Sequence, residues 1–261
     1  MKDSNLATYK ATGIVNYYAK LSRLQPAERT ILKHFQSRWG EMKMLDIGIG
    51  GGRTTRYFAP LVKEYVGIDY SAEMIAACKQ KLENTLANVS LKVTDARDLS
   101  QFESNYFDFI LFSFNGIDYA CHSDRLKIFQ EVARVGKSGG YFGFSSHNLQ
   151  AMAKEFVLSQ KLSFNLFKTY VDLIMFVIGK IFNPHITPDK INNATHLIIR
   201  DESHNFRLQT YYIRPQAQIA QLKPNFKNVK VYSWQSGREI KNMDDTAIDL
   251  DMWLYYLGTI L

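Results

Sequence analysis

The residues whose types and spacing best suit chemistry lie in a glycine-rich stretch near position 50. Asp46 ends a short apolar run, and Gly48, Gly50 and Gly52 follow at alternate positions before a segment in which a helix starts at Thr54. Glycine is needed where the backbone takes a positive φ or approaches a ligand closely, so this spacing leaves a concavity lined by amides at a strand-to-helix turn. We expect a loop that holds a nucleotide-type cofactor.

The third glycine distinguishes two kinds of cofactor loop. A dinucleotide-binding fingerprint requires glycine or alanine three residues after its second glycine. In this sequence Arg53 occupies that position, and Gly52 comes one residue before it. The pattern D-x-G-x-G-x-G therefore argues against a dinucleotide.

Two further aspartates end the next two strands that the sequence predicts. Asp69 closes the apolar run 64–69, and Asp95 follows the run 89–93. An acid at the carboxyl end of a parallel strand points into the ligand crevice, where it costs desolvation free energy unless a ligand or a backbone amide pairs with it. Asp69 also lies 21 residues after Gly48, close to the spacing at which an acid meets a ribose diol. We therefore expect both aspartates in the cofactor site.

An alternation of strands and helices from residue 43 onward positions these groups. Short apolar runs predict strands, and the segments between them have apolar residues at helical spacing, with Ser71 as a helix cap. Gly139 and Gly140 predict a turn before the fifth strand. Strands that alternate with helices form a parallel sheet with right-handed crossovers. The predicted strands are 44–47, 64–69, 89–93, 107–112 and 141–144. Helices are predicted over 54–60 and 125–135, and a further helix follows Ser71 with Met74, Ile75 and Cys78 on its buried side.

The chain divides into four predicted parts. These are an N-terminal helical arm over 1–40, the cofactor-binding core over 41–150, a helical and hairpin lid insertion over 151–214, and a segment over 215–261 that completes the sheet. The arm contains two helices, the second of which opens at Pro26. The insertion contains a helix over 164–182 and a hairpin of strands 195–200 and 206–213, and the last part contains a helix over 215–222 and strands six and seven over 229–234 and 252–257.

Residues 44–145 resemble the core of the class I S-adenosylmethionine-dependent methyltransferases. The resemblance rests on L-D-I-G-I-G-G-G at the glycine loop, V-G-I-D-Y-S at the second strand, T-D-A-R-D-L after the third and F-D-F-I-L-F-S-F-N along the fourth. It implies an α/β, Rossmann-like seven-stranded sheet with helices on both faces, a reversed seventh strand, and a lid insertion between strands five and six. It also implies S-adenosyl-L-methionine as the cofactor and methyl transfer as the activity.

The resemblance assigns cofactor roles to the residues that match these motifs. The loop of Asp46, Gly48, Gly50 and Gly52 would accommodate the methionine moiety, Asp69 would take the ribose hydroxyls with Tyr70 beside the adenosine, Asp95 and the amide of Ala96 would meet the adenine, and Phe114 would flank the sulfonium. The fourth strand runs out in Ser113-Phe114-Asn115-Gly116, without the proline-proline-aromatic tail of the DNA adenine and glutamine methylating branches. Those substrates are therefore not expected.

Methyl transfer from a sulfonium is an in-line displacement, so alignment and desolvation supply much of the catalysis. A hydroxyl acceptor also needs a base that titrates near neutrality, for which histidine is the usual residue. His147 directly follows the fifth strand and is the best-placed candidate, and Asn115 and Tyr18 are further catalytic candidates. The candidates for substrate binding are Tyr119, His122, Tyr211 and Tyr212, of which the last two alternate along a strand so that only one can face the pocket. Second-rank candidates are Tyr9, Tyr17, Arg23, His185, His196 and His204.

Composition restricts the compartment and the partners. The formal net charge of +7 is spread over both halves of the chain, which is a poor electrostatic footprint for nucleic acid. Cys78 and Cys121 have neither metal-ligand nor disulfide spacing, which predicts a reducing compartment and no metal site. The polar N-terminus lacks the apolar core of a signal peptide, and Lys168, Asp172 and Lys180 interrupt the most apolar stretch. We expect a cytoplasmic protein with no membrane span.

The function that these patterns favour is methyl transfer to a nitrogen or oxygen of a small organic molecule. Three alternatives remain open at this point. A tRNA or rRNA methyltransferase would have a localised basic stripe with exposed aromatic residues and a steep salt dependence of binding. A protein with this fold could also catalyse a non-methylating reaction, or bind a partner without catalysis. The sequence leaves the acceptor, the methylated atom and the oligomeric state undetermined.

Overall fold

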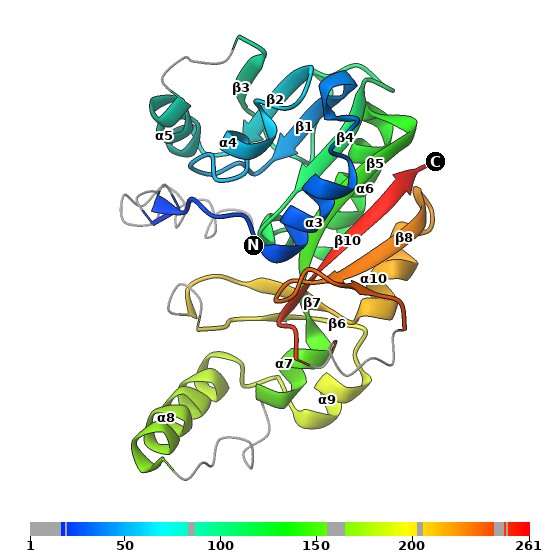
Figure 1. Cartoon of the computed structure of the whole chain (residues 1–261). Coiled ribbons are helices and arrows are strands. Elements are labelled where there is room, and N and C mark those ends of the chain that lie inside the picture. The colour runs from blue at the N-terminus through cyan, green and yellow to red at the C-terminus, as the bar shows by residue number, and fades with distance from the viewer. Residues whose placement is uncertain are drawn as a thin grey trace.

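The central element of the computed structural model is a sheet in the strand order β3-β2-β1-β4-β5-β10-β8-β9 (Figure 1). The structure describes residues 17, 18, 20–82, 87–155, 165–202, 206–242, 248 and 250–261. The strands of this order are β1 (Lys43–Ile47), β2 (Glu64–Asp69), β3 (Val89–Val93), β4 (Phe107–Phe112), β5 (Gly136–Asn148), β8 (Phe226–Ser233), β9 (Glu239–Ile240) and β10 (Trp253–Ile260).

The strand directions confirm the predicted parallel core and its reversed strand, but the sheet of the described residues has ten strands where seven were expected. Strands β1 to β5 pair in parallel. Strand β10 runs antiparallel to both of its neighbours, β5 and β8. It is the reversed seventh strand that the segment 252–257 predicts. The carboxyl ends of β1, β2 and β4 therefore meet at one edge, where a ligand crevice is expected.

Helices cover both faces of the sheet, as predicted. Along β4, Phe109 packs in a cluster with Ile31 of α3, whereas Ile110 packs in a second cluster with Phe129 of α6. Because successive side chains of a strand point to opposite faces, these two clusters are the two layers of the core. The helical segments are α3 (Pro26–His34), η1 (Trp39–Glu41), α4 (Thr55–Phe58), α5 (Ala72–Leu82), η2 (Gly116–Tyr119), α6 (His122–Val135), α7 (Leu149–Glu155), α8 (Leu166–Phe182), α9 (Pro188–Asn193) and α10 (Pro215–Leu222).

Several boundaries differ from the expected ones. The turn predicted at Gly139 and Gly140 is wrong, because β5 already begins at Gly136 and continues through both glycines. Gly139 has a φ of +80° and lies where the pairing of β4 with β5 shifts register, so the two glycines form an irregularity within the strand. Helix α6 begins at His122, three residues before the predicted start. The first of the two helices expected in the N-terminal arm lies largely outside the described residues.

The insertion after β5 contains the predicted hairpin and joins it to the main sheet. Strands β6 (His196–Ile199) and β7 (Thr210–Ile213) pair antiparallel. In addition, β7 pairs in parallel with the end of β5, where His147 lies beside Tyr212. The hairpin therefore extends the sheet past the carboxyl end of β5, an arrangement that the sequence did not predict. Among the described segments, no helix is both long enough and apolar enough to span a membrane.

Candidate functional site

A cavity of about 390 Å³ lies at the carboxyl ends of β1, β2 and β4. Sites for small molecules and cofactors typically measure roughly 300–1,000 Å³. Of the residues predicted from the sequence, the described lining includes Tyr18, Asp46, Gly48, Gly50, Asp69, Tyr70, Asp95, Ala96, Phe114 and Tyr119. The cavity therefore brings together most of the predicted cofactor residues, and two aromatic candidates from other parts of the chain lie beside them.

The glycine loop has the backbone that its spacing predicts. Gly48, Gly50 and Gly52 have φ values of +67°, +53° and +82°. A Cβ atom on Gly48 would lie 2.9 Å from a ring carbon of Phe112, and one on Gly52 would lie 2.7 Å from the Cys78 sulfur. Gly48 and Gly50 line the cavity, whereas Gly52 is not among its described lining residues. The structure thus gives Gly52 a packing role against α5, and its proposed contact with the methionine moiety stays a prediction.

Asp69 connects the second strand to the glycine loop. Its Oδ2 accepts the amide of Gly50 at 2.9 Å, and its Oδ1 accepts the amide of Ser71 at 2.9 Å. Burial raises the pKa of this carboxyl to about 6, and the hydrogen bonds from Ser71 and Gly50 oppose that rise. Each carboxylate oxygen has a further acceptor position. Asp69 can therefore hold the loop and still accept a hydrogen bond from a ligand in the cavity.

Asp46 lies beneath the loop, where two hydroxyl groups of the protein bind one of its carboxylate oxygens. Its Oδ2 accepts the hydroxyl of Thr54 at 2.6 Å and that of Tyr65 at 2.5 Å. Burial raises the pKa of Asp46 to about 7, against the opposing effect of both hydroxyls. The carboxyl joins β1 to β2 and to the start of α4, so its contribution is to fix the shape of the loop.

Asp95 and Ala96, which follow β3, also line the cavity. The guanidinium of Arg97 forms an ion pair with Asp95 and a second one with Asp124, for which the nitrogen–oxygen distance is 2.9 Å. The Asp95 side chain remains 41% exposed. A ligand that hydrogen-bonds to Asp95 therefore shares its carboxylate with Arg97, a partner that the sequence did not predict.

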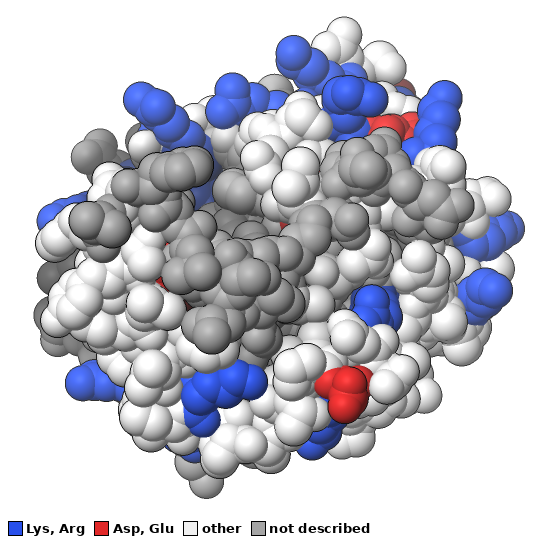
Figure 2. Space-filling model, turned by 90° about the horizontal axis from the view of Figure 1, so that it is seen from below, with Lys and Arg blue, Asp and Glu red and all other residues white. Residues whose placement is uncertain are grey.

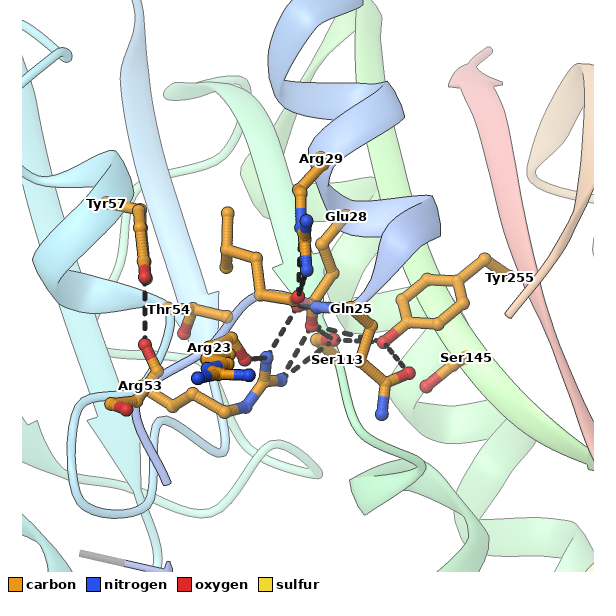
Figure 3. Close-up of polar contacts among 12 residues, drawn as sticks. Arg23, Gln25, Glu28, Arg29, Arg53, Thr54, Tyr57, Ser113, Ser145 and Tyr255 are labelled. Atoms are coloured by element: carbon orange, nitrogen blue, oxygen red, sulfur yellow. Dashed lines mark hydrogen bonds and ion pairs between the residues drawn. The ribbon is translucent and has the colours of Figure 1, made fainter. Parts of the chain in front are cut away.

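Arg53 forms a buried ion pair with Glu28 of α3, behind the loop (Figure 3). Its Nη1 lies 2.5 Å from Oε2 and its Nη2 lies 2.6 Å from Oε1, which is a bidentate arrangement. Ser113 at the end of β4 also donates to Glu28, and the hydroxyls of Ser113 and Tyr255 lie 2.9 Å apart. The pair thus connects α3, the glycine loop and strands β4 and β10.

The same arginine supports the aromatic residues at the cavity. Its guanidinium carbon lies 4.9 Å from the ring centre of Phe114, within the range of a cation–π contact. On Phe114 the ring of Tyr18 packs edge-on, with 6.2 Å between the ring centres. Tyr18, which belongs to the N-terminal segment, therefore lies against the cavity.

His147 and a second buried acid form a polar cluster next to the cavity. The Nδ1 atom of His147 lies 2.7 Å from Oδ2 of Asp118, and Oδ1 of Asp118 accepts hydrogen bonds from Arg125 and from Ser146. The side chains of Asp118 and Arg125 are fully buried. On the other side of the ring, Nε2 of His147 lies 3.4 Å from the side-chain nitrogen of Asn115. The sequence analysis missed Asp118 and Arg125.

Three further predicted residues, His122, His196 and Tyr211, form an aromatic stack separate from the cavity. His122 Nδ1 lies 2.7 Å from the hydroxyl of Tyr211, and His196 stacks on both rings. Tyr212 points to the other side of the hairpin, where its hydroxyl donates to Asp201 at 2.7 Å. Both tyrosines are buried, and neither is among the described lining of the cavity. Their substrate role therefore has no support from the geometry of the cavity. The described residues include no group of three or more side chains arranged to hold a metal ion.

Comparison with known proteins agrees with this site. Residues 44–140 match the family model described as a methyltransferase domain. The chain is 37% identical over 110 residues to the uncharacterized methyltransferase YcgJ of Bacillus subtilis, which is 41% of either chain. It is 37% identical over 109 residues to phosphoethanolamine N-methyltransferase 2 of Caenorhabditis elegans, over 40% of this chain and 24% of that protein. The match thus spans less than half the length of these two relatives.

A third relative matches over a larger share of its length. The chain is 30% identical over 148 residues to phosphatidylethanolamine N-methyltransferase of Cereibacter sphaeroides, which covers 56% of this chain and 68% of that protein. Among solved structures, a putative S-adenosylmethionine-dependent methyltransferase from Listeria monocytogenes has the same fold, with a TM-score of 0.61 at 21% identity over 90% of this chain and 97% of that chain. The chain therefore belongs to the class I S-adenosylmethionine-dependent methyltransferase family, whose cofactor is S-adenosyl-L-methionine.

Proposed function

We propose that the protein transfers a methyl group to a nitrogen or oxygen atom of a small organic molecule. The observation that supports this most strongly is the cavity itself, in which the bare loop at Gly48 and Gly50 meets the acids Asp69 and Asp95. S-adenosyl-L-methionine, when bound there, supplies a methyl group on a positively charged sulfur. The protein then has to hold the cofactor, align the acceptor with that methyl group and exclude water.

The residues of the cavity fit such a cofactor. Gly48 and Gly50 leave backbone open toward the cavity, and Asp69 offers carboxylate oxygens as acceptors for ribose hydroxyls. Ala96 and Asp95 also line the cavity and would meet the adenine. Phe114 lies where β4 ends, so its ring can shield the reacting centre from water, and Arg53 holds that ring from behind.

An amine is the acceptor that we favour. Two of the relatives are named as N-methyltransferases of phosphoethanolamine and of phosphatidylethanolamine, which both have a primary amine. An alkyl amine with a pKa near 10, similar to that of lysine, carries a proton at neutral pH and cannot attack until it loses that proton. A base therefore assists an amine acceptor as well as a hydroxyl acceptor.

We assign the role of base to His147, with Asp118 as the residue that orients it. A proton on Nδ1 of His147 donates to Asp118, which leaves Nε2 with the lone pair that accepts a proton. His147 is not in the described lining of the cavity. Its Nε2 atom lies beside Asn115, however, and the two chain neighbours of Asn115, Phe114 and Gly116, both line the cavity. The acceptor would bind at this border. The side-chain oxygen of Asn115 is buried and has no partner in the described structure, so a flip of its amide would give protonated Nε2 an acceptor.

Two measurements test the proposal. Calorimetry with S-adenosylhomocysteine should show one site per chain, with weaker binding to Asp69→Asn. Uptake of labelled methyl groups should then be measured with ethanolamine, phosphoethanolamine and phosphatidylethanolamine, and with phenols and total tRNA as comparisons. Uptake by an amine with no uptake by tRNA supports the assignment. Salt-sensitive methylation of tRNA alone would replace it with an RNA methyltransferase, and cofactor binding without uptake by any acceptor class would contradict the proposed activity.

A further inference from the structure

Helix α8 has its apolar side chains on the surface of the molecule. A helix of a globular protein normally turns its apolar side toward the core and its charges toward water. In α8, Phe167 is 76% exposed, Ile181 is 68% exposed and Tyr170 is 63% exposed. The full set of exposed apolar residues, here called the α8 stripe, is Phe167, Tyr170, Val171, Ile174, Val177, Ile181 and Phe182.

The α8 stripe occupies one side of the helix. At 3.6 residues per turn, its members fall within an arc of about 140°. Asp172 and Lys180 lie outside that arc and are half-buried. The ammonium group of Lys180 donates to the backbone carbonyl of Ile186 at 3.1 Å. Leu173 and Phe176 lie on the same side as Asp172 and Lys180 and are also half-buried, so the helix is apolar on two sides, and the outer one is the exposed α8 stripe.

Contacts at its carboxyl end hold α8 in this orientation. The Asn183 amide nitrogen donates to the carbonyls of Gly179 and Arg200, at 2.9 and 2.8 Å, and its side-chain oxygen accepts the Arg200 amide at 2.8 Å. The ring of Phe182 stacks on Phe206 with 5.1 Å between the ring centres. Within the described part of the chain, no member of the α8 stripe belongs to one of the buried hydrophobic clusters.

We propose that the α8 stripe is a dimer interface that packs against the same stripe of a second copy of this chain. Aromatic and branched apolar side chains of this size present roughly 150–220 Å² each when fully exposed, so the exposed fractions correspond to about 700 Å² for the stripe. A stable, specific interface buries about 800 Å² on each partner. The largest apolar patch of an ordinary monomer measures only about 300–600 Å². The stripe therefore has about the area that a stable dimer requires.

The order of side chains along α8 suits pairing with itself. Phe167, Ile174 and Ile181 recur every seven residues, the spacing at which helices pack along a common seam. In an antiparallel pair related by a twofold axis, the large residues of the amino-terminal half lie opposite the smaller residues of the carboxyl-terminal half. Phe167 and Tyr170 of one copy then face the region of Val177 and Ile181 of the other, and Ile174 lies close to the axis.

The charges near α8 favour a second copy over a lipid surface. A helix that lies on an anionic membrane has rows of lysine or arginine along its polar side. On the side of the molecule that contains α7, α8 and α9, the lysine and arginine side chains of the described residues are scattered and do not gather into one patch (Figure 2). On α8 itself, Asp172 lies between the two lysines of the sequence, and Lys180 is engaged with Ile186.

The test is the mass of the full chain in solution. Sedimentation equilibrium of the wild-type protein should give twice the chain mass. Ile174→Glu and Val177→Glu should each reduce it to the chain mass, because both place a charge in the centre of the seam. Leu61→Glu is the matched control, since Leu61 is 44% exposed and lies outside α8; this variant should remain dimeric. Circular dichroism melts should show that all three variants fold.

A mixing experiment tests the self-pairing directly. Ile174→Glu and Ile174→Lys should each sediment as a monomer, and an equal mixture of the two should regain the dimer mass because opposite charges then meet near the axis. A wild-type protein that sediments as a monomer overturns the proposal, as does a dimer that Ile174→Glu leaves intact. A monomeric wild-type chain that co-sediments with vesicles of phosphatidylcholine and phosphatidylglycerol would instead assign the stripe to lipid.

Discussion

The carboxylate of Asp118 holds His147 at two points, through the backbone amide at 2.6 Å and through Nδ1 at 2.7 Å, both to the same oxygen. This double contact fixes the position of the ring as well as its tautomer. The other oxygen of Asp118 is bound by Arg125 and Ser146, so the acid itself cannot turn away. The polar cluster is therefore rigid on the side away from the cavity and presents only Nε2 toward Asn115.

His147→Ala should abolish most of the turnover while cofactor binding is retained. Removal of a positioned general base typically costs roughly 10²–10⁴-fold in rate. Because His147 is outside the described lining of the cavity, the affinity for S-adenosylhomocysteine should change little. Steady-state kinetics and calorimetry on the same preparation separate the two effects. Full activity of the variant would reduce His147 to a structural residue.

Asp118→Ala should destabilise the fold far more than the loss of one surface charge. The change leaves the Arg125 guanidinium fully buried without its acid partner, a situation that typically costs about 3–5 kcal/mol. The double variant Asp118→Ala, Arg125→Met should recover part of this loss, because the unpaired charge is gone. Lys230→Ala is the control, since Lys230 pairs with Glu239 at 3.6 Å on the surface and such pairs contribute about 1 kcal/mol or less. Urea unfolding measures all three free energies, and a double variant no more stable than the single one would contradict the pairing argument.

Cofactor affinity should fall as the pH drops below about 6. Burial raises the pKa of Asp69 to about 6 in the free protein. A ribose hydroxyl donates a stronger hydrogen bond to the ionised carboxylate than to the protonated carboxyl. Affinity for S-adenosylhomocysteine should therefore be constant above the pKa and decline by up to about tenfold per pH unit below it. Asp69→Asn should show weaker binding with no such decline. An equal decline in this variant would assign the titration to another group.

The sequence predicts best those features that depend on neighbouring residues. Apolar runs locate the parallel strands. Asp69 ends β2 and Asp95 follows β3, and both line the cavity, because the carboxyl ends of parallel strands lie at the same edge of the sheet. The glycine loop is predictable for the same reason. Its φ values and close contacts follow from residues within a single strand-turn-helix unit.

The features that the sequence missed depend on residues far apart in the chain. Asp118 contacts Ser146 and His147, 28 and 29 residues later, and Arg53 pairs with Glu28, 25 residues earlier. Arg53 attracted notice only as the residue that breaks a dinucleotide pattern. The two glycines in β5 predicted a turn because local propensity favours one. In the structure β5 pairs with β4 at Gly136 and again from Tyr141 onward, so the glycines lie at the register shift between these two pairings.

Stability should fall with rising pH because of Asp46. Its pKa is raised by burial to about 7 from an ordinary value of 3.8, so between these values the folded chain binds a proton that the unfolded chain has lost. The stabilisation is complete below the unfolded pKa and is lost as the pH rises through the folded one. Asp46→Asn cannot titrate, and its side-chain oxygen can still accept from Thr54 and Tyr65. Between pH 4 and pH 8 the wild type should therefore lose stability relative to this variant by an amount on the order of 4 kcal/mol, at about 1.4 kcal/mol per pKa unit.

Urea unfolding at several pH values measures this difference. Asp98→Asn is the matched control, because hydrogen bonds from Ser100 lower the pKa of the exposed Asp98 carboxyl. Its contribution has the opposite sign, since a carboxyl with a lowered pKa stabilises the fold above its unfolded pKa and loses that effect as the pH falls. The two variants should thus diverge from the wild type in opposite directions across the acidic range. A free-energy difference between the wild type and Asp46→Asn that does not vary with pH would show that Asp46 is ionised in the folded protein throughout, held so by the hydroxyls beneath the loop.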